Sequence, residues 1–223
     1  MVPEVSVEAW RKRYESVPVP AVVREVVSVM PDEDDTAAPV LCVAGDDRGA
    51  AAFTQNWLNH LASRGHEAHA VSVRGQGNTP KAGGGTAGKA HDVVQAASRL
   101  SRRAILIGHG FGAMYVVHAL LRYPAAAAVL VAPRGVKASV GTPAGDPPIL
   151  VAGCPEDRKS NEKRLDAVAA AYGSEPLLFS GVGHDFMADA GWQAPLDAII
   201  DWLQAEKVGL ANPHTMAPLS SSP

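Results

Sequence analysis

The sequence predicts an α/β domain with a mostly parallel central sheet flanked by helices. Short apolar runs alternate along the chain with runs of helical periodicity. The middle apolar runs are continuous in Val, Ile, Leu and Ala, which is typical of strands covered on both faces. Such alternation implies right-handed βαβ crossovers, so ligand chemistry is expected on loops at the carboxyl ends of the strands.

Each expected element is an apolar run of the appropriate period. Helices are expected around residues 53–61, where Phe53, Trp57, Leu58 and Leu61 form one stripe, and around 93–100. The clearest helix covers 192–203, with apolar residues at helical spacing. Seven strands are expected, at residues 22–29, 40–44, 68–73, 104–107, 127–132, 149–152 and 177–179.

Length and composition bound the class of protein. The 223 residues, 47% hydrophobic and 19% charged, suit one globular domain with a sizeable core. We expect an N-terminal extension at 1–21, a single domain at 22–208 and a disordered C-terminal tail at 209–223. The net charge of −3 gives no reason to expect a nucleic acid or an anionic membrane as partner.

The cysteines and the N-terminus indicate the compartment. Cys42 and Cys154 are too few for a disulfide scaffold and lie in apolar runs, so buried free thiols are expected. The first twenty residues mix charges with prolines and do not resemble a secretory signal. With no apolar run long enough to span a bilayer, a cytoplasmic protein is expected.

The segment AILIGHGFGAMYVVHALL, residues 104–121, places a glycine-rich turn between a strand and a helix. The turn reads Gly108-His109-Gly110-Phe111-Gly112. A nucleophile elbow is written G-x-S-x-G, with the catalytic serine on the sharp turn from strand to helix. Here the serine position holds Gly110, which has no side chain.

The order of the segments around this turn resembles the α/β-hydrolase superfamily, above all its small esterase- and lipase-like members. The resemblance covers about residues 22–203. It rests on the turn Arg74-Gly75-Gln76-Gly77, on the elbow, on the later strands ending in GCPEDR and GVGHDFM, and on the closing helix GWQAPLDAIIDWL. The family's chain order is nucleophile, acid, histidine. The resemblance implies an α/β-hydrolase fold.

Carried over residue by residue, the resemblance makes His184 the catalytic histidine. An imidazole can both take and return a proton near neutral pH. The acid is Asp157, with Glu156 as its rival, because GCPEDR is one residue longer than the family's usual spacing. The acid would accept the Nδ1 proton of His184 and fix the tautomer.

The sequence departs from the family pattern at three places. Gly110 removes the nucleophile while keeping the turn, since glycine adopts strained dihedrals at little cost. The backbone amides of Asp46, after Gly45, and of Phe111 could form an oxyanion hole, but a carboxylate at Asp46 is unfavourable beside an oxyanion. The family's cap domain is missing: a Pro- and Gly-rich loop at 134–148 stands in its place, which predicts a shallow, open site.

Other nucleophiles are weaker candidates. Asp46 and Asp47 follow a strand near the expected site, and a carboxylate can attack or act as a base. Family members that use aspartate place it at the elbow, however. Cys154 is expected to pack in the core, and Ser180 to end a strand.

No cofactor and no metal are expected. The elbow also reads G-x-G-x-x-A, a loose dinucleotide fingerprint, but it lies in mid-chain and no acid follows for a ribose. His60, His66 and His69 lack a Cys or carboxylate pattern and are interpreted as scattered surface residues. His109 is expected to support the site structurally.

Two functions remain open. In the first, His184 and Asp157 perform non-covalent acid–base chemistry on a small carbonyl substrate of the ester, lactone or thioester class. In the second, the chain is a catalytically inactive pseudoenzyme that serves as a binding or regulatory module. Gly110 could also be a substitution particular to this copy.

Overall fold

The computed structural model describes residues 19–32, 37–137 and 140–208. Most of the predicted N-terminal extension and the whole predicted tail at 209–223 lie outside these residues. Among the residues described, no helix is long and apolar enough to cross a membrane.

Within these residues, seven strands form one sheet in the order β1-β3-β2-β4-β5-β6-β7. β1 pairs antiparallel with β3, and all other pairs are parallel. The predicted α/β fold with a mostly parallel sheet is confirmed. The strands are β1 (Val26–Val29), β2 (Val40–Val43), β3 (Ala68–Val71), β4 (Ile105–His109), β5 (Ala127–Val131), β6 (Ile149–Gly153) and β7 (Leu177–Leu178).

The first strand is shorter than the sequence predicts, since it begins at Val26 instead of residue 22. Arg24 and Glu25 are engaged elsewhere: Arg24 donates to Asp92, and the Glu25 N–H donates to Thr79 Oγ1. These contacts direct the chain to the loop after β3. β4, by contrast, extends two residues beyond the predicted strand to His109, directly before the elbow.

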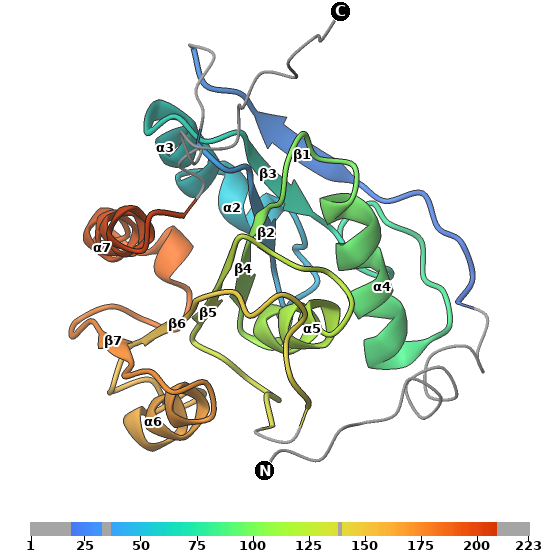
Figure 1. The fold of residues 1–223 in the computed structure, drawn as a ribbon. Coiled ribbons are helices and arrows are strands. Elements are labelled where there is room, and N and C mark those ends of the chain that lie inside the picture. The colour runs from blue at the N-terminus through green and yellow to red at the C-terminus, as the bar shows by residue number, and fades with distance from the viewer. Residues whose placement is uncertain (1–18, 33–36, 138–139, 209–223) are drawn as a thin grey trace, which may run out of the picture.

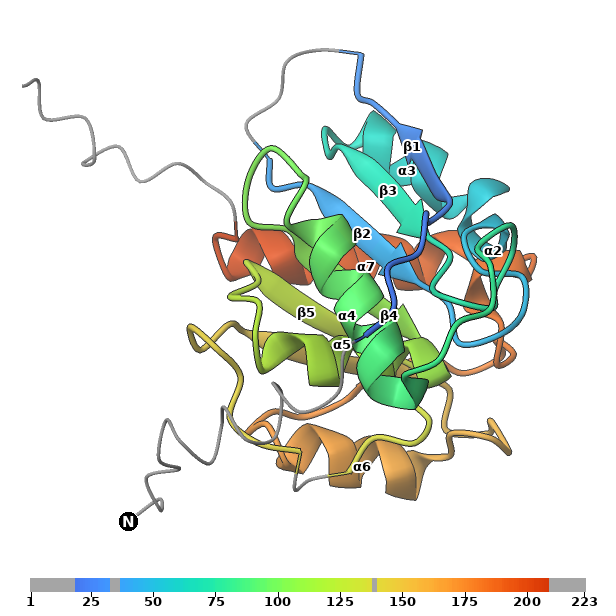
Figure 2. The ribbon, with the colours of Figure 1, turned by 90° about the vertical axis from the view of Figure 1, so that its right-hand side faces the viewer.

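Helices cover both faces of the sheet (Figure 1). α3 and α7 pack on one face, while α4 and α5 lie on the other, in front of the sheet in Figure 2. The helices are α2 (Ala51–Thr54), α3 (Trp57–Ser63), α4 (Gly85–Ala97), α5 (Phe111–Leu120), α6 (Glu162–Ala170) and α7 (Gln193–Ala205), with a 3-10 helix η1 (Phe186–Ala188).

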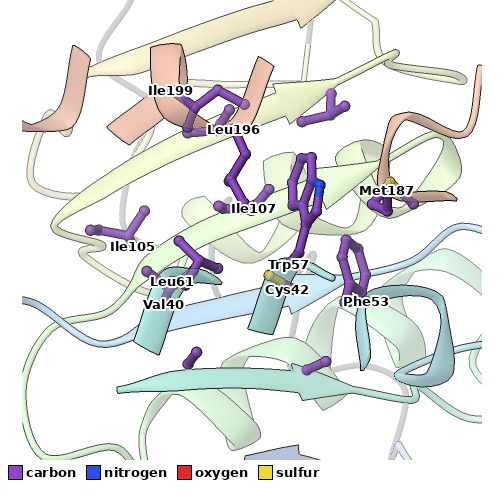
Figure 3. Packing of buried hydrophobic residues seen from close by; sticks show 14 of the residues in the cluster. Val40, Cys42, Phe53, Trp57, Leu61, Ile105, Ile107, Met187, Leu196 and Ile199 are labelled. Carbon is purple, nitrogen blue, oxygen red and sulfur yellow. The ribbon is translucent and has the colours of Figure 1, made fainter. Parts of the chain in front are cut away.

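The core between the sheet and α3/α7 is built from large side chains (Figure 3). Trp57 and Leu61 of α3, Leu196 of α7 and Ile107 of β4 are fully buried there. Cys42 of β2 is also fully buried, and burial raises the pKa of its thiol. Both cysteines are free and buried, as predicted.

A buried ion pair holds the Arg-Gly-Gln-Gly turn after β3. The guanidinium of Arg74 donates from Nε and Nη2 to the two carboxylate oxygens of Asp92, each at 2.8 Å. Both residues are almost completely buried, and the Arg74 N–H also donates to Asp92. This anchor on α4 fixes the loop beside the carboxyl end of β2, where the candidate site begins.

Candidate active site

Gly110 forms a sharp turn between β4 and α5. Its φ of 58° and ψ of −120° lie in a region that L side chains rarely adopt. Its N–H donates to the carbonyl of Val131 at 3.0 Å, and its carbonyl accepts from the Arg134 N–H at 2.9 Å. The backbone of an elbow is therefore present and anchored to the neighbouring strand end.

Close backbone packing surrounds this turn. A Cβ on Gly112 would overlap the carbonyl of Val43, and a Cβ on Gly45 would overlap the backbone of Phe111. The first turn of α5 thus lies directly against the end of β2. This contact brings the Gly45–Asp46 loop and the elbow together.

His184 and Asp157 form a hydrogen-bonded pair. Asp157 follows β6 and His184 follows β7, and His184 Nδ1 lies 2.6 Å from Asp157 Oδ2. Burial opposes ionisation of Asp157, but hydrogen bonds from His184 and from the Lys159 N–H outweigh it and lower the pKa of the carboxyl. Asp157 therefore remains a carboxylate that orients the imidazole.

Of the two carboxylates that the sequence leaves open, Asp157 is the one that contacts His184. The extra residue of GCPEDR lies in a turn, in which the Asp157 N–H donates to the Cys154 carbonyl at 3.1 Å. Glu156 is exposed on this turn and accepts a hydrogen bond from Cys154 Sγ. Cys154 thus lies in the core with its thiol engaged, and Ser180 is exposed at the end of β7.

The space where a serine side chain would stand is empty in the described part of the chain. A Cβ built on Gly110 would lie 3.5 Å from His184 Nε2, and no other described atom beyond the adjoining residues comes within 4 Å. His184 Nε2 therefore faces the open side of Gly110, the residue that the sequence analysis expects at the nucleophile position. The gap can hold a hydroxyl group or a water molecule.

The two N–H groups that the sequence analysis expects to form an oxyanion hole belong to Asp46, after β2, and to Phe111, at the start of α5. Within the described ranges, the N–H groups of Asp46 and Phe111 have no hydrogen-bond acceptor. The Asp46 carboxylate is paired with Arg48, whose Nη2 lies 2.6 Å from Asp46 Oδ2 and 3.2 Å from Asp185 Oδ1. Burial by itself would raise the pKa of the Asp46 carboxyl, but the hydrogen bonds and the charge of Arg48 outweigh burial, so the pKa lies below its ordinary value. Arg48 therefore offsets the negative charge that the sequence flags as unfavourable.

His109, the last residue of β4, contacts His184 beside the elbow. Its Nε2 lies 2.9 Å from the His184 carbonyl and the two rings lie 4.9 Å apart. Because a carbonyl only accepts, Nε2 must carry the proton, and the buried Nδ1 has no partner among the described residues. Burial lowers the pKa of His109 to about 4, so its ring is neutral at pH 7.

One group of potential metal ligands is found in the part of the chain described: His109, His184 and Asp185. His109 Nε2 already donates to a carbonyl, and Asp185 is paired with Arg48. A metal would have to displace both contacts, so these residues fit a metal poorly. The three histidines that the sequence analysis interprets as surface residues are apart and engaged: His60 with Asp197, His66 with the Ala38 carbonyl and His69 with Ser28. The surface interpretation is wrong for His66 and His69, which are buried, each with a hydrogen bond through one ring nitrogen that offsets the cost of burial.

The structure gives no support to two further candidates from the sequence, Asp47 as a nucleophile and the elbow as a dinucleotide-binding turn. The carbonyl of Asp47 accepts the Gly77 N–H, and Asp47 does not line the cleft around the elbow. The G-x-G-x-x-A pattern at 108–113 begins in β4, in the middle of the sheet, and not in a first βαβ unit. The structure therefore favours neither Asp47 as a nucleophile nor a dinucleotide site at 108–113.

A small cleft joins these parts. Its volume is about 80 Å³, well below the roughly 300–1,000 Å³ of ligand pockets. Between β5 and β6 the described residues form no helix or strand. The cleft is lined by Gly45, Asp46, His109, Gly110, Phe111, Arg134, Lys159, His184 and Asp185.

Sequence reasoning missed three cations around this cleft. Arg48, Arg134 and Lys159 each stand within three residues of a strand end or of a predicted site residue. This closeness in sequence is the signal that could have identified the three cations as neighbours of the site. A charged loop residue is usually solvated, however, and only the fold shows which of them border a cleft.

The comparisons with known proteins agree with this geometry. A family model described as "Alpha/beta hydrolase family" matches residues 40–222. No curated protein matches the sequence. Est1E from Butyrivibrio proteoclasticus, bound to ferulic acid, superimposes with a TM-score of 0.68 at 14% identity, over 85% of this chain and 98% of that one.

Two more solved structures have the same fold. An alpha-beta serine hydrolase homologue from Coxiella burnetii has a TM-score of 0.66 at 18% identity, over 85% of this chain and 94% of its own. A serine-to-glycine variant of the N-acyl homoserine lactonase AidH, complexed with N-hexanoyl homoserine lactone, has a TM-score of 0.67. Its identity is 14%, over 84% of this chain and 95% of its own. At these low sequence identities, the similarity shows only that the folds are alike.

Proposed function

The chain belongs to the alpha/beta hydrolase family, as the order of its sequence segments predicts, and from this premise we propose that it hydrolyses small carboxylic esters without a covalent intermediate. One observation carries the proposal. The pair of His184 and Asp157 is intact, and the free Nε2 of His184 faces the empty side of Gly110. A water molecule in that gap replaces the serine hydroxyl as the attacking group.

The reaction follows from the positions of these groups. His184 Nε2 takes a proton from water while the water oxygen bonds to the ester carbonyl carbon. The N–H groups of Asp46 and Phe111 stabilise the oxyanion of the tetrahedral intermediate. Its collapse breaks the bond to the alkoxide, which recovers the proton from His184, and leaves a carboxylic acid. Asp157 stabilises the imidazolium between the two transfers.

The solved structures of similar fold support this substrate class. They include a thermophilic esterase from Thermogutta terrifontis and an N-acyl homoserine lactonase. The lactonase variant with glycine in place of a serine is complexed with a lactone, so a glycine substitution in that protein is compatible with a bound substrate. In this chain, the neutralised Asp46 and the free N–H groups beside Gly110 favour the same polarised carbonyl group.

The test is hydrolysis of p-nitrophenyl acetate, a γ-lactone and a short thioester by the protein and its His184→Ala and Asp157→Asn variants. General-base catalysis contributes about 10²- to 10⁴-fold, so His184→Ala should lose turnover by that factor. His60→Ala, which removes a histidine on α3, is the matched control and should retain it. Turnover that survives His184→Ala would contradict the mechanism.

A pseudoenzyme is the second candidate, favoured by the missing side chain at Gly110 and by a cleft of about 80 Å³. It predicts no turnover of any of the three substrates. In that case the cleft binds ligands without converting them. His184-dependent hydrolysis excludes this candidate.

A further inference from the structure

Two positively charged residues border the cleft and take no part in the proposed hydrolysis. Arg134 follows β5, and Lys159 follows the acid Asp157. Both come from loops at the carboxyl edge of the parallel strands, which meet beside the elbow.

Among the described residues, these two cations have no acidic partner. In the described part of the chain, no carboxylate or carbonyl accepts a hydrogen bond from the Arg134 guanidinium or from the Lys159 ammonium. Arg48, the third cation, differs because Asp46 and Asp185 neutralise it. Asp46 and Asp185 also line the cleft and share Arg48, so an anion is favoured here by direct contact with Arg134 and Lys159 and not by the net charge of the cleft.

The backbone holds both residues close to the reacting groups. The Arg134 N–H donates to the Gly110 carbonyl, and its guanidinium lies 4.3 Å from the centre of the Phe111 ring. The Lys159 N–H donates to Asp157 Oδ1 at 2.8 Å. The backbone of one residue is thus bonded to the elbow and that of the other to the acid, and both residues line the cleft that contains Gly110 and His184.

We propose that Arg134 and Lys159 form an anion subsite and that the substrate is a small ester carrying a carboxylate on its acyl chain, such as a monoester of a dicarboxylic acid. The planar guanidinium fork matches a carboxylate, and the ammonium adds a second charge. Arg134 and Lys159 line the same small cleft as Gly110 and His184, so a short spacer between the anion and the carbonyl suffices. The hydrolytic part of this proposal rests on the proposed function, whereas anion binding does not.

The test compares two p-nitrophenyl esters with five-carbon acyl chains: the glutarate monoester, which is anionic, and the neutral pentanoate. We expect kcat/KM to favour the glutarate ester by about tenfold or more, which corresponds to about 1.4 kcal/mol. Arg134→Met and Lys159→Met should each reduce this ratio about three- to tenfold, and the double variant should abolish it. Raising the salt concentration to 0.5 M should also reduce the ratio.

Matched controls come from the same two loops. Lys137→Met and Arg158→Met remove the same charge from residues that are exposed and do not border the cleft, and they should leave the ratio within twofold. A ratio near one in the unmodified protein, or equal losses in the control variants, overturns the subsite. A methyl phosphate arm, as a competitor of the glutarate ester, tests the source of the anion: a phosphate that binds more tightly than monomethyl glutarate overturns the carboxylate assignment.

A binding measurement separates this proposal from the proposed function. Monomethyl glutarate is titrated by NMR into the protein, into Arg134→Met and into His184→Ala. Binding that depends on Arg134, with no turnover in the unmodified protein, supports the subsite and contradicts the hydrolase. His184-dependent turnover of both esters at equal rates supports the hydrolase and overturns the subsite.

Discussion

Replacing Gly110 with serine tests whether the elbow still has the geometry of a nucleophile site. The backbone φ of 58° at this position is strained for any L side chain, which costs about 1–3 kcal/mol. No further steric cost is expected, because the nearest atom to the new Cβ, His184 Nε2, lies at an ordinary contact distance of 3.5 Å. For a chain of this length, that loss lowers Tm by about 2–12 °C.

Gly110→Ala is the matched control, since it adds the same Cβ and the same backbone strain without a hydroxyl. Both variants should lose equal stability in thermal and urea unfolding. Gly110→Ser alone should react with a fluorophosphonate and show a burst with p-nitrophenyl acetate. The rates of labelling and of the burst should both fall about 10²- to 10⁴-fold when His184→Ala is added to Gly110→Ser.

Two results would refute the reasoning. If Gly110→Ser and Gly110→Ala are both as stable as the unmodified protein, the positive φ at this turn does not describe the molecule. If Gly110→Ser is not labelled, or is labelled equally in the absence of His184, then the vacant position is not aligned with the imidazole. Stability and labelling are independent, so each can fail alone.

Three further variants probe the surroundings of the site. Because the pKa of His109 is about 4 in the folded protein against 6.5 ordinarily, the unfolded state takes up a proton first as the pH falls; the free energy of unfolding should drop by roughly 3 kcal/mol between pH 7 and pH 4, and His109→Gln should remove this drop in urea titrations. Arg48→Met leaves the Asp46 carboxylate unneutralised beside the oxyanion and should lower kcat for neutral esters about tenfold; an unchanged kcat would contradict that role. Asp92→Asn breaks a buried ion pair and should cost about 3–5 kcal/mol of stability, whereas Asp166→Asn, on the exposed side of α6, should cost less than about 0.5 kcal/mol.

The sheet was predictable because burial on both faces leaves a direct mark on sequence. A strand such as β4 or β5 contacts helices on each side, so nearly every residue in it is apolar. The edge strand β1 has no such constraint, and its start was predicted four residues too early. There, the side-chain contacts of Arg24 and Glu25 with distant residues decided where pairing begins.

Local sequence also determined the elbow and the order of the site segments. A glycine-rich turn between an apolar run and a helix has few alternatives, and the later segments GCPEDR and GVGHDFM follow strands in the family's order. The turn at Gly110, the identity of His184 as the histidine near it and the absence of a hydroxyl at that position were all readable from short motifs. The family match agrees with this order.

Only the tertiary structure decided between Glu156 and Asp157, since adjacent residues of a turn point in different directions and the sequence does not show which direction faces His184. The tertiary structure also decided that Arg48 pairs with Asp46 and that, among the described residues, Arg134 has no carboxylate partner. The strength of an ion pair depends on the distance between the two charges, and loops after strands that are separate in sequence set these distances, as in the contact of Gly110 with Arg134. The sequence by itself determined the fold and the glycine at the elbow; the packing of loops at one edge of the sheet determined the charges that surround Gly110.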